Sequence, residues 1–275
     1  MERVVYSDRI ASEETCPILS GEGSMSTVDV KVDVARVTKQ FDAENPEQGL
    51  ALSEVSFGVR TNEFVAIVGR SGCGKSTMLN IIAGLLDPTE GEVRINGKPV
   101  KGPGLDRGMV FQHASLFPWL TAIENIEFGP RNLGVPKEKR RELAQGLIDL
   151  VRLKGFEDKY PRELSGGMQQ RVAIARAMAM DPEILLMDEP FGALDQLTRE
   201  DMQHELLRIW ESHKKTVLFV THSIIESVYL ADRVLVFAPH PGSIRKEFPI
   251  TLPRPRQKSS TEFMHYYEEI YEAIG

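Results

Sequence analysis

The segment that most constrains how this chain folds is FVAIVGRSGCGKST, residues 64 to 77. Its first half is apolar at consecutive positions, which is typical of a strand buried on both faces of a parallel sheet. Its second half has the form G-x-x-x-x-G-K-[ST] from Gly69 to Ser76, and STMLNIIAGLL can form a helix after it. A glycine-rich loop can turn several backbone N–H groups inward, and the helix adds the positive end of its dipole. The sequence therefore predicts a strand–loop–helix unit that binds phosphate groups.

Each part of this loop has an expected task. Lys75 would neutralise the β and γ phosphates of a nucleotide, and Ser76 would be a ligand of Mg²⁺. The predicted nucleotide-binding residues of the loop are Gly69, Arg70, Ser71, Gly72, Cys73, Gly74, Lys75, Ser76 and Thr77. Because Cys73 lies near a helix N-terminus, its thiol pKa is expected to be lowered, so that a thiol reagent would block hydrolysis. The alternative is that Cys73 is an inert small residue.

A second chemical signal ends another buried apolar run, ILLMDEP, at residues 184–190. Ligands of open α/β sheets bind at the carboxyl ends of the strands, where this run places Asp188. Asp188 is therefore expected to supply a second protein oxygen to Mg²⁺. Glu189 follows it directly and is predicted to be the general base that activates water.

Periodicity elsewhere predicts an α/β protein with a mostly parallel sheet. The buried runs alternate with amphipathic helices such as the one that follows Asp195, and this order is typical of parallel strands. The buried runs are EFVAIVG (63–69), ILLMDEP (184–190), TVLFVTH (216–222) and RVLVFAP (233–239). Alternating apolar and charged residues predict a separate antiparallel sheet near the N-terminus, with a tight turn at Asn96-Gly97. Its strands are VDVKVDVARV from Val28, LSEVSFGVR (52–60) and GEVRING (91–97).

The chain divides into three expected regions. Residues 1–27 are polar and predict a flexible extension, residues 28–245 form the nucleotide-binding domain, and residues 246–275 form a C-terminal extension. Within the domain, residues 115–165 predict an inserted helical lobe, because they hold four prolines and no candidate for a buried strand. One helix in the lobe is marked by Leu143, Leu147, Leu150 and Val151. A terminal helix is marked by Phe263, Tyr267, Ile270, Tyr271 and Ile274.

Composition restricts the partners and the compartment. The 275 residues carry 33 basic and 40 acidic side chains, a net charge of −7, so nucleic acid is not the expected partner. Two cysteines far apart in sequence indicate a reducing cytoplasm rather than a disulfide framework. No apolar run approaches the roughly 18 residues that span a bilayer, and the N-terminus has no secretory pattern.

The stretch LSGGMQQR, residues 164–171, is the most specific motif of the chain, because many phosphate-loop ATPases lack it. With the phosphate loop and Asp188-Glu189, it resembles the ATP-binding subunits of ABC transporters over about residues 28–245. The resemblance implies a P-loop NTPase core with an N-terminal antiparallel β subdomain and an inserted ABC helical subdomain. It also implies that the signature residues contact nucleotide, which here are Ser165, Gly166, Gly167 and Gln169.

The same resemblance implies roles for four further residues. Phe41 in VTKQFD would stack on adenine, and Gln112 in MVFQHASLFPWLT would contact Mg²⁺ and face a membrane subunit. His222 in VTHSIIE would contact the γ-phosphate, and Asp195 in GALD would cross between two protomers. The catalytic set is thus Lys75, Gln112, Glu189 and His222, and the metal set is Ser76, Gln112 and Asp188.

A second anion-binding site is expected where Ser165-Gly166-Gly167 begins an alanine-rich helical stretch. Two such anion-binding sites on one chain suggest a shared nucleotide site. The resemblance implies a homodimer in which each ATP lies between the Lys75 loop of one copy and the Ser165 loop of the other.

A single nucleotide-binding unit without a membrane span favours the ATPase subunit of an importer. FQHASLFPWLTAIENI and PHPGSIRKEFPITLPRPR resemble the branch that imports nitrate, sulfonate, taurine and bicarbonate. The resemblance implies import of a small anionic solute through separate permease subunits, with a solute-binding protein as an indirect partner. It places the chain peripherally on the cytoplasmic face of the inner membrane. The alternatives are an exporter ATPase subunit or a soluble ABC ATPase that acts on DNA or ribosomes.

Overall fold

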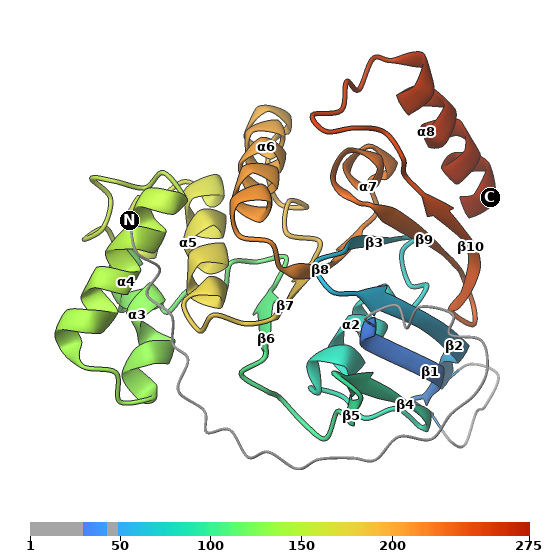
Figure 1. The fold of residues 1–275 in the computed structure, drawn as a ribbon, viewed down its shortest axis with the longest axis horizontal. Coiled ribbons are helices and arrows are strands. Elements are labelled where there is room, and N and C mark those ends of the chain that lie inside the picture. Colours follow the sequence, from blue (N-terminus) through green and yellow to red (C-terminus); the bar gives the residue numbers. More distant parts are fainter. Residues whose placement is uncertain (1–29, 43–48) are drawn as a thin grey trace, which may run out of the picture.

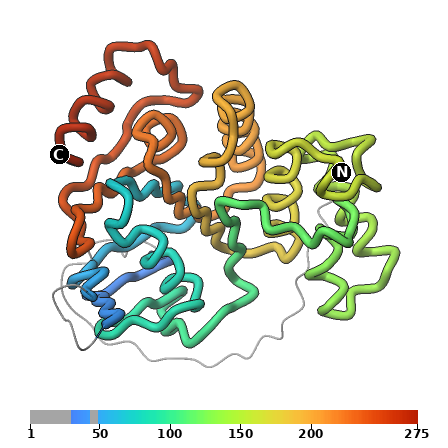
Figure 2. The backbone as a smooth tube through the Cα atoms, turned by 180° about the vertical axis from the view of Figure 1, so that it is seen from behind, coloured from blue at the N-terminus to red at the C-terminus, as the bar shows by residue number. Residues whose placement is uncertain are grey.

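The computed structural model describes residues 30–42 and 49–275, so the extension expected over residues 1–27 lies outside the described residues. Figure 1 shows a central sheet with a helical lobe on one side and a smaller sheet on the other. The view from behind in Figure 2 shows the same division. No helix in the described part of the chain has both the length and the apolar surface that crossing a bilayer requires.

The central sheet has six strands in the order β10-β9-β3-β8-β7-β6. The five strands from β9 to β6 are parallel, and β10 pairs antiparallel with β9 at the edge. The strands are β3 (Phe64–Val68), β6 (Arg107–Val110), β7 (Ile184–Asp188), β8 (Thr216–Thr221), β9 (Arg233–Ala238) and β10 (Ser243–Pro249). The prediction of a mostly parallel sheet is confirmed, and all four buried runs are strands of it. The strand β6, which has only four residues, was not predicted from the sequence.

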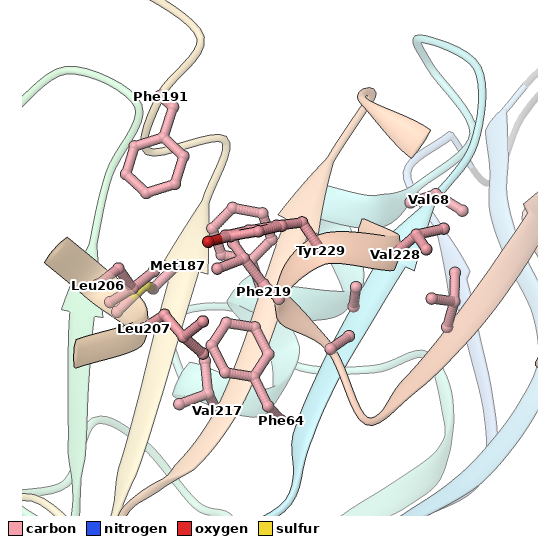
Figure 3. Close-up of a cluster of buried hydrophobic side chains, with 14 of the residues drawn as sticks. Phe64, Val68, Met187, Phe191, Leu206, Leu207, Val217, Phe219, Val228 and Tyr229 are labelled. Atoms are coloured by element: carbon pink, nitrogen blue, oxygen red, sulfur yellow. The ribbon is translucent and has the colours of Figure 1, made fainter. Parts of the chain in front are cut away.

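Both faces of the central sheet are buried, as the consecutive apolar residues predict. Phe64, Ala66 and Val68 of β3 face a cluster that includes residues of α6 (Gln196–Ser212), α7 (Ile224–Leu230) and α8 (Thr261–Ile274). Figure 3 shows the centre of this cluster, where Phe64 and Phe219 lie near Leu207 and Tyr229.

The opposite face of the central sheet packs on α2 (Lys75–Ala83) and on the smaller sheet. Val65 and Ile67 of β3 belong to this second cluster, together with Met78 and Leu79 of α2. The helix that carries the end of the phosphate loop is therefore enclosed between two sheets.

The smaller sheet is antiparallel, with strand order β2-β1-β4-β5. Its strands are β1 (Val30–Gln40), β2 (Leu50–Arg60), β4 (Glu90–Ile95) and β5 (Lys98–Pro99). Asn96 and Gly97 turn the chain between β4 and β5 with φ values of 51° and 73°, as a type I′ hairpin requires. The predicted antiparallel subdomain and its tight turn are confirmed.

The inserted lobe is helical, as predicted, but its last helix lies beyond the expected bound at residue 165. It contains α3 (Ala122–Asn132), α4 (Lys137–Leu150), the short 3-10 helix η1 (Pro161–Glu163) and α5 (Gly166–Met178). A capping box between Thr121 and Glu124 starts α3. Leu143 was expected on the apolar face of α4 but is 39% exposed, because Ala144, Leu147 and Ile148 form the buried stripe instead.

The C-terminal residues join the central core. β10 runs across residue 245, where sequence analysis divides the nucleotide-binding domain from the C-terminal extension. Helix α8 buries Phe263 and Ile270 in the same cluster as Phe64. The buried guanidinium of Arg256 donates to the carbonyl groups of Val228 and Ala231 at the end of α7, and its burial lowers the pKa of Arg256 to about 10.

Candidate functional site

The loop from Gly69 to Ser76 connects β3 to α2, so the expected strand–loop–helix unit is present. Lys75 is only 5% exposed. Its ammonium group donates to the carbonyl oxygens of Gly69 at 2.9 Å and Arg70 at 3.1 Å. The loop therefore wraps around this ammonium group and fixes one positive charge at its centre.

The glycines of the loop are needed by the protein itself. Gly74 has φ 87°, and a methyl group on it would stand 2.6 Å from Cδ2 of Leu52. A methyl group on Gly69 would stand 2.7 Å from the carbonyl oxygen of Phe237. Both distances are too short for real contacts, so the strands behind the loop already exclude a side chain at these positions. The glycines were expected because they let the loop turn its N–H groups inward, and packing against these strands is a second reason for them.

Cys73 does not have the environment that sequence analysis expected. Its side chain is fully buried, and desolvation raises the pKa of the thiol in spite of the nearby Lys75. The predicted lowered pKa is therefore wrong. The helix dipole and Lys75 favour the thiolate, but burial outweighs both.

Ser76 and Asp188 meet at the start of α2 and the end of β7. The Ser76 hydroxyl donates to Oδ1 of Asp188 at 2.9 Å, which places two oxygen donors side by side. Desolvation raises the pKa of Asp188, the hydrogen bond from Ser76 opposes this shift, and the charge of Glu189 adds to it. Because burial disfavours the charged form of this carboxylate, a bound cation would stabilise it.

Gln112 lies beside the turn that follows Asp188. It comes two residues after β6, and its Nε2 atom stands 3.0 Å from the point that a methyl group on Gly192 would occupy. The neighbouring carbonyl of Phe111 accepts a hydrogen bond from Gln170 of α5. The Gln112 loop thus lies between the carboxyl edge of the central sheet and the helical lobe.

Glu189 and His222 are hydrogen-bonded, with Oε2 and Nδ1 2.9 Å apart. Glu189 has φ 44°, a left-handed conformation that is unfavourable for this residue type, and its N–H donates to the carbonyl of Val220. The His222 side chain is 59% exposed. The pair offers a carboxylate that can accept a proton from water, held in place by an accessible imidazole.

The signature residues begin helix α5. Ser165 is its N-cap, accepts a hydrogen bond from the Met168 N–H at 3.3 Å, and is exposed together with Gly166. Gly167 is buried, and a methyl group on it would stand 2.5 Å from Cγ2 of Thr198 on α6. Gln169 donates to the carbonyls of Pro161 and Leu164, so in this structure its amide supports the loop that leads to Ser165.

Asp195 and Phe41 lie on other elements. Asp195 is the exposed N-cap of α6, and the hydrogen bond that it accepts from the Thr198 N–H lowers its pKa. Phe41 follows β1 directly and is 62% exposed, with the Lys39 ammonium group 5.3 Å from the centre of its ring. An exposed aromatic ring of this kind is free to stack on a planar ligand.

The structure thus joins the predicted residues in groups. Lys75 lies in the loop next to the Ser76–Asp188 pair, and Glu189 contacts His222 one residue further along. Glu226, a buried carboxylate one turn after His222, was not predicted from the sequence as a site residue. The pattern Ser223-x-x-Glu226 was a visible signal, but it indicates a capping box rather than the contacts that Glu226 makes.

Comparison with known proteins gives the family. A family model described as ABC transporter matches residues 52–192. An uncharacterised ABC transporter ATP-binding protein of Methanocaldococcus jannaschii is 54% identical over 245 residues, which cover 89% of this chain and 91% of that protein. The nitrate import ATP-binding protein NrtD of Synechocystis is 48% identical over 80% of this chain and 86% of that protein. The taurine import ATP-binding protein TauB of Roseobacter denitrificans is 46% identical over 79% and 81%.

Among solved structures, the fold is similar to a dimeric post-hydrolysis state of the ATP-binding cassette MJ0796 bound to ADP and Pi. That cassette is 36% identical, with a TM-score of 0.68 over 81% of this chain and 100% of that one. The family model spans the phosphate loop and the Asp188-Glu189 pair, and the relatives cover most of the chain. The chain therefore belongs to the ABC transporter family, as one of its ATPases.

Proposed function

We propose that this chain hydrolyses ATP at the Glu189–His222 pair to power the import of a small anionic solute. The observation that carries the hydrolytic part is the 2.9 Å contact between Glu189 and His222, one residue beyond Asp188. The import part is supported by relatives named for nitrate and taurine import at 48% and 46% identity. Nitrate and taurine are both small and carry an anionic group, which gives the expected class of solute.

In this proposal the phosphate loop binds the triphosphate of ATP. The Lys75 ammonium group balances the charge of the phosphates. The free N–H groups at the start of α2 and the positive end of its dipole also favour the bound phosphates. The exposed ring of Phe41 stacks on adenine. These contacts bind and orient ATP but do not by themselves cleave it.

The oxygen donors beside the loop fit Mg²⁺. A hydroxyl and a carboxylate 2.9 Å apart are the hard ligands that this ion prefers, with few protein ligands and several from water and phosphate. Ser76 and Asp188 would hold the ion, and Gln112 would add an amide oxygen. When bound, Mg²⁺ neutralises phosphate charge.

Glu189 is the general base of the proposal. Its carboxylate accepts a proton from the attacking water, and the hydrogen bond to His222 keeps it in the left-handed turn that projects it from the end of β7. His222 remains exposed enough to reach the γ-phosphate.

A second copy of the chain completes the site in this proposal. Figures 1 and 2 show α5, whose N-cap is Ser165, in the helical lobe, away from α2 at the phosphate loop. The Ser165 site of one chain and the Lys75 loop of another would together enclose one ATP, and Asp195 would cross between them. A two-fold dimer contains two such sites. The dimeric cassette MJ0796 with ADP and Pi supports this arrangement.

The motion would reach separate permease subunits through the Gln112 loop. Beyond Gln112, Trp119 is 68% exposed and its ring centre lies 5.6 Å from that of Phe117 in a tilted arrangement, which leaves an aromatic surface beside the helical lobe. A helix of the permease is the proposed occupant of this surface. The chain would then be peripheral on the cytoplasmic face of the inner membrane, with a solute-binding protein as an indirect partner.

The experiment is ATPase measurement on the wild type and on Glu189→Gln. The substitution keeps the size of the side chain and removes its basicity, so we expect kcat to fall by about 100-fold or more while ATP still binds. Gel filtration with ATP should show more dimer in the variant. Wild-type turnover by Glu189→Gln would refute the role of Glu189.

Reconstitution then tests the direction and the solute. This chain, reconstituted in vesicles with the candidate permease and binding protein, should hydrolyse ATP faster when nitrate, sulfonate or taurine is present than when it is absent. Stimulation without any binding protein would indicate an exporter. Stimulation by DNA or ribosomes, without a membrane partner, would indicate a soluble ABC ATPase.

A further inference from the structure

A buried carboxylate lies one turn beyond the candidate site. Glu226 is in the first turn of α7 and is 5% exposed. A carboxylate can be buried at this depth only where hydrogen bonds or ion pairs replace water, so its partners show which parts of the protein it joins.

One oxygen of Glu226 fixes the turn that carries His222. The Thr221 hydroxyl donates to Oε2 at 2.5 Å, and the same hydroxyl accepts the Ser223 N–H at 3.0 Å. The residues on both sides of His222 are therefore held by one hydroxyl, which is held in turn by Glu226. In a capping box the carboxylate would bind the Ser223 N–H itself, and here that N–H is bonded to Thr221.

The other oxygen of Glu226 faces helix α6. Gln203 donates its amide to Oε1 at 3.4 Å, and the Arg199 guanidinium is 3.9 Å from the same atom. Gln203 is itself fixed by the ammonium group of Lys258 at 2.9 Å.

Arg199 extends this connection to the loop after β7. Its guanidinium donates to the carbonyl oxygens of Leu194 at 2.8 Å and Phe191 at 3.4 Å. That loop begins at Glu189 and ends at Asp195. The buried Thr221 and Glu226 and the half-buried Arg199 therefore form a chain of contacts from the His222 turn to the loop that carries Glu189 and Asp195.

We propose that Glu226 is a positioning residue for ATP hydrolysis, which holds the His222 turn at a fixed distance from the 189–195 loop. This inference rests on the proposed roles of Glu189 and His222. The His222 turn and the 189–195 loop are joined on the exposed side by the contact between Glu189 and His222. They are joined on the buried side through Glu226. The buried link fixes the imidazole beside the Glu189 carboxylate before any ligand binds.

The consequence differs between binding and turnover. The side-chain hydrogen bonds of Lys75 and Ser76, the groups proposed to bind phosphate and Mg²⁺, go to Gly69, Arg70, Cys73 and Asp188, and so lie outside the Thr221–Glu226–Arg199 chain. Loss of the buried link should therefore leave ATP affinity intact and misplace His222. A misplacement of about 1 Å in a reacting group costs on the order of 100-fold in rate.

The test uses a matched pair at Thr221. Thr221→Val keeps the shape and removes the hydroxyl, whereas Thr221→Ser keeps the hydroxyl and removes a methyl group. We expect Thr221→Val to lower kcat by about 10- to 100-fold with KM for ATP within about twofold, and Thr221→Ser to restore most of that loss. Glu226→Gln provides a second variant of equal size if Thr221→Val folds poorly, and circular dichroism reports folding.

Two further comparisons separate positioning from general stability. In a His222→Ala background, Thr221→Val should cause no further loss in single-turnover rate, because the residue through which it acts is gone. The double variant Thr221→Val/Glu226→Gln should lose no more rate than the worse single variant. Equal further loss in the His222→Ala background, or multiplied losses in the double variant, would overturn the proposal.

A Glu189→Gln control distinguishes the two levels of the proposal. If Glu189→Gln is inactive and folded Thr221→Val and Glu226→Gln both keep wild-type kcat, the positioning role fails and the proposed function stands. If Glu189→Gln turns over at the wild-type rate, the proposed function fails and the positioning role fails with it.

Discussion

Three glycines allow the phosphate loop and its support to be tested separately. Gly72 has φ 80° and open space around it, since a methyl group there would have His240 as its nearest neighbour at 3.9 Å. Gly242, in the turn between β9 and β10, has no left-handed φ, but a methyl group there would stand 2.3 Å from the carbonyl oxygen of Cys73. Gly74 combines both conditions, with φ 87° and Leu52 at 2.6 Å.

The geometry gives an order and a size for the three alanine variants. A left-handed alanine costs about 1–2 kcal/mol, and the stiffer unfolded chain offsets up to about 1 kcal/mol, so Gly72→Ala should cost about 1 kcal/mol. Overpacking against backbone atoms costs about 1–3 kcal/mol, and the upper end applies to Gly242→Ala because a carbonyl cannot rotate away. Gly74→Ala should cost the sum, about 3–4 kcal/mol.

Urea unfolding of the nucleotide-free protein measures these free energies. The slope of unfolding free energy against urea concentration should be the same for all three variants. The urea concentration at the midpoint should be highest for Gly72→Ala, lower for Gly242→Ala and lowest for Gly74→Ala. Gly242→Ala should also weaken ATP binding, because relief of the clash moves the Cys73 backbone within the phosphate loop. The Gly97→Ala variant, with φ 73° and nothing within 4 Å, is the matched control outside the loop. Equal midpoints for Gly72→Ala and Gly242→Ala would refute the claim that the β9–β10 turn supports the loop.

Two further predictions concern titratable groups in the site. In a Cys16→Ser background, Cys73 should react with a thiol reagent only at the rate of unfolding, because its thiol is buried and its pKa is raised; rapid modification of the native protein would contradict this. The raised pKa of Asp188 means that the folded state favours the protonated acid, so its stabilising contribution exists below the unfolded value of 3.8 and is lost as pH rises through the folded pKa. Asp188→Asn should therefore unfold at a higher temperature than the wild type at pH 7 without nucleotide, with a gap that shrinks toward pH 4; a gap independent of pH would argue against a buried charge.

Local patterns were sufficient where one residue type decides the structure. The consecutive apolar residues of β3 predicted burial on both faces, and Asn96-Gly97 predicted a turn that needs two positive φ angles. Sequence patterns predicted helices after Asp195 and after Ser165, and the structure has α6 and α5 there with these two residues as N-caps. In each case the signal lies within a few residues of the feature.

Features set by distant neighbours could not be predicted in this way. The four residues of β6 form a strand because they pair with β7, and their own sequence is too short to show it. Cys73 follows a helix-start pattern that favours a thiolate, yet its pKa is decided by burial, which no local pattern reports. Glu226 fits the sequence pattern of a capping box, in which its carboxylate would accept the Ser223 N–H. Instead, the Thr221 hydroxyl accepts that N–H and donates to Glu226. Tertiary packing replaced the local expectation at each of these places.

The position of the candidate site follows from strand order more than from any single motif. Strands β3, β8, β7 and β6 are neighbours and parallel, so their carboxyl ends share one edge of the sheet. Each is followed within two residues by a candidate group, which are Gly69, His222, Glu189 and Gln112 respectively. The register between β7 and β8 sets how far along the strands these groups lie. Asp188 pairs with Val220, and the Glu189 N–H donates to the carbonyl oxygen of the same residue. Since alternate residues of a strand face opposite sides, a slip of one residue between β7 and β8 would turn Asp188 away from Ser76 and separate Glu189 from His222. The buried runs of the central sheet therefore determine the geometry of the candidate site as well as stability.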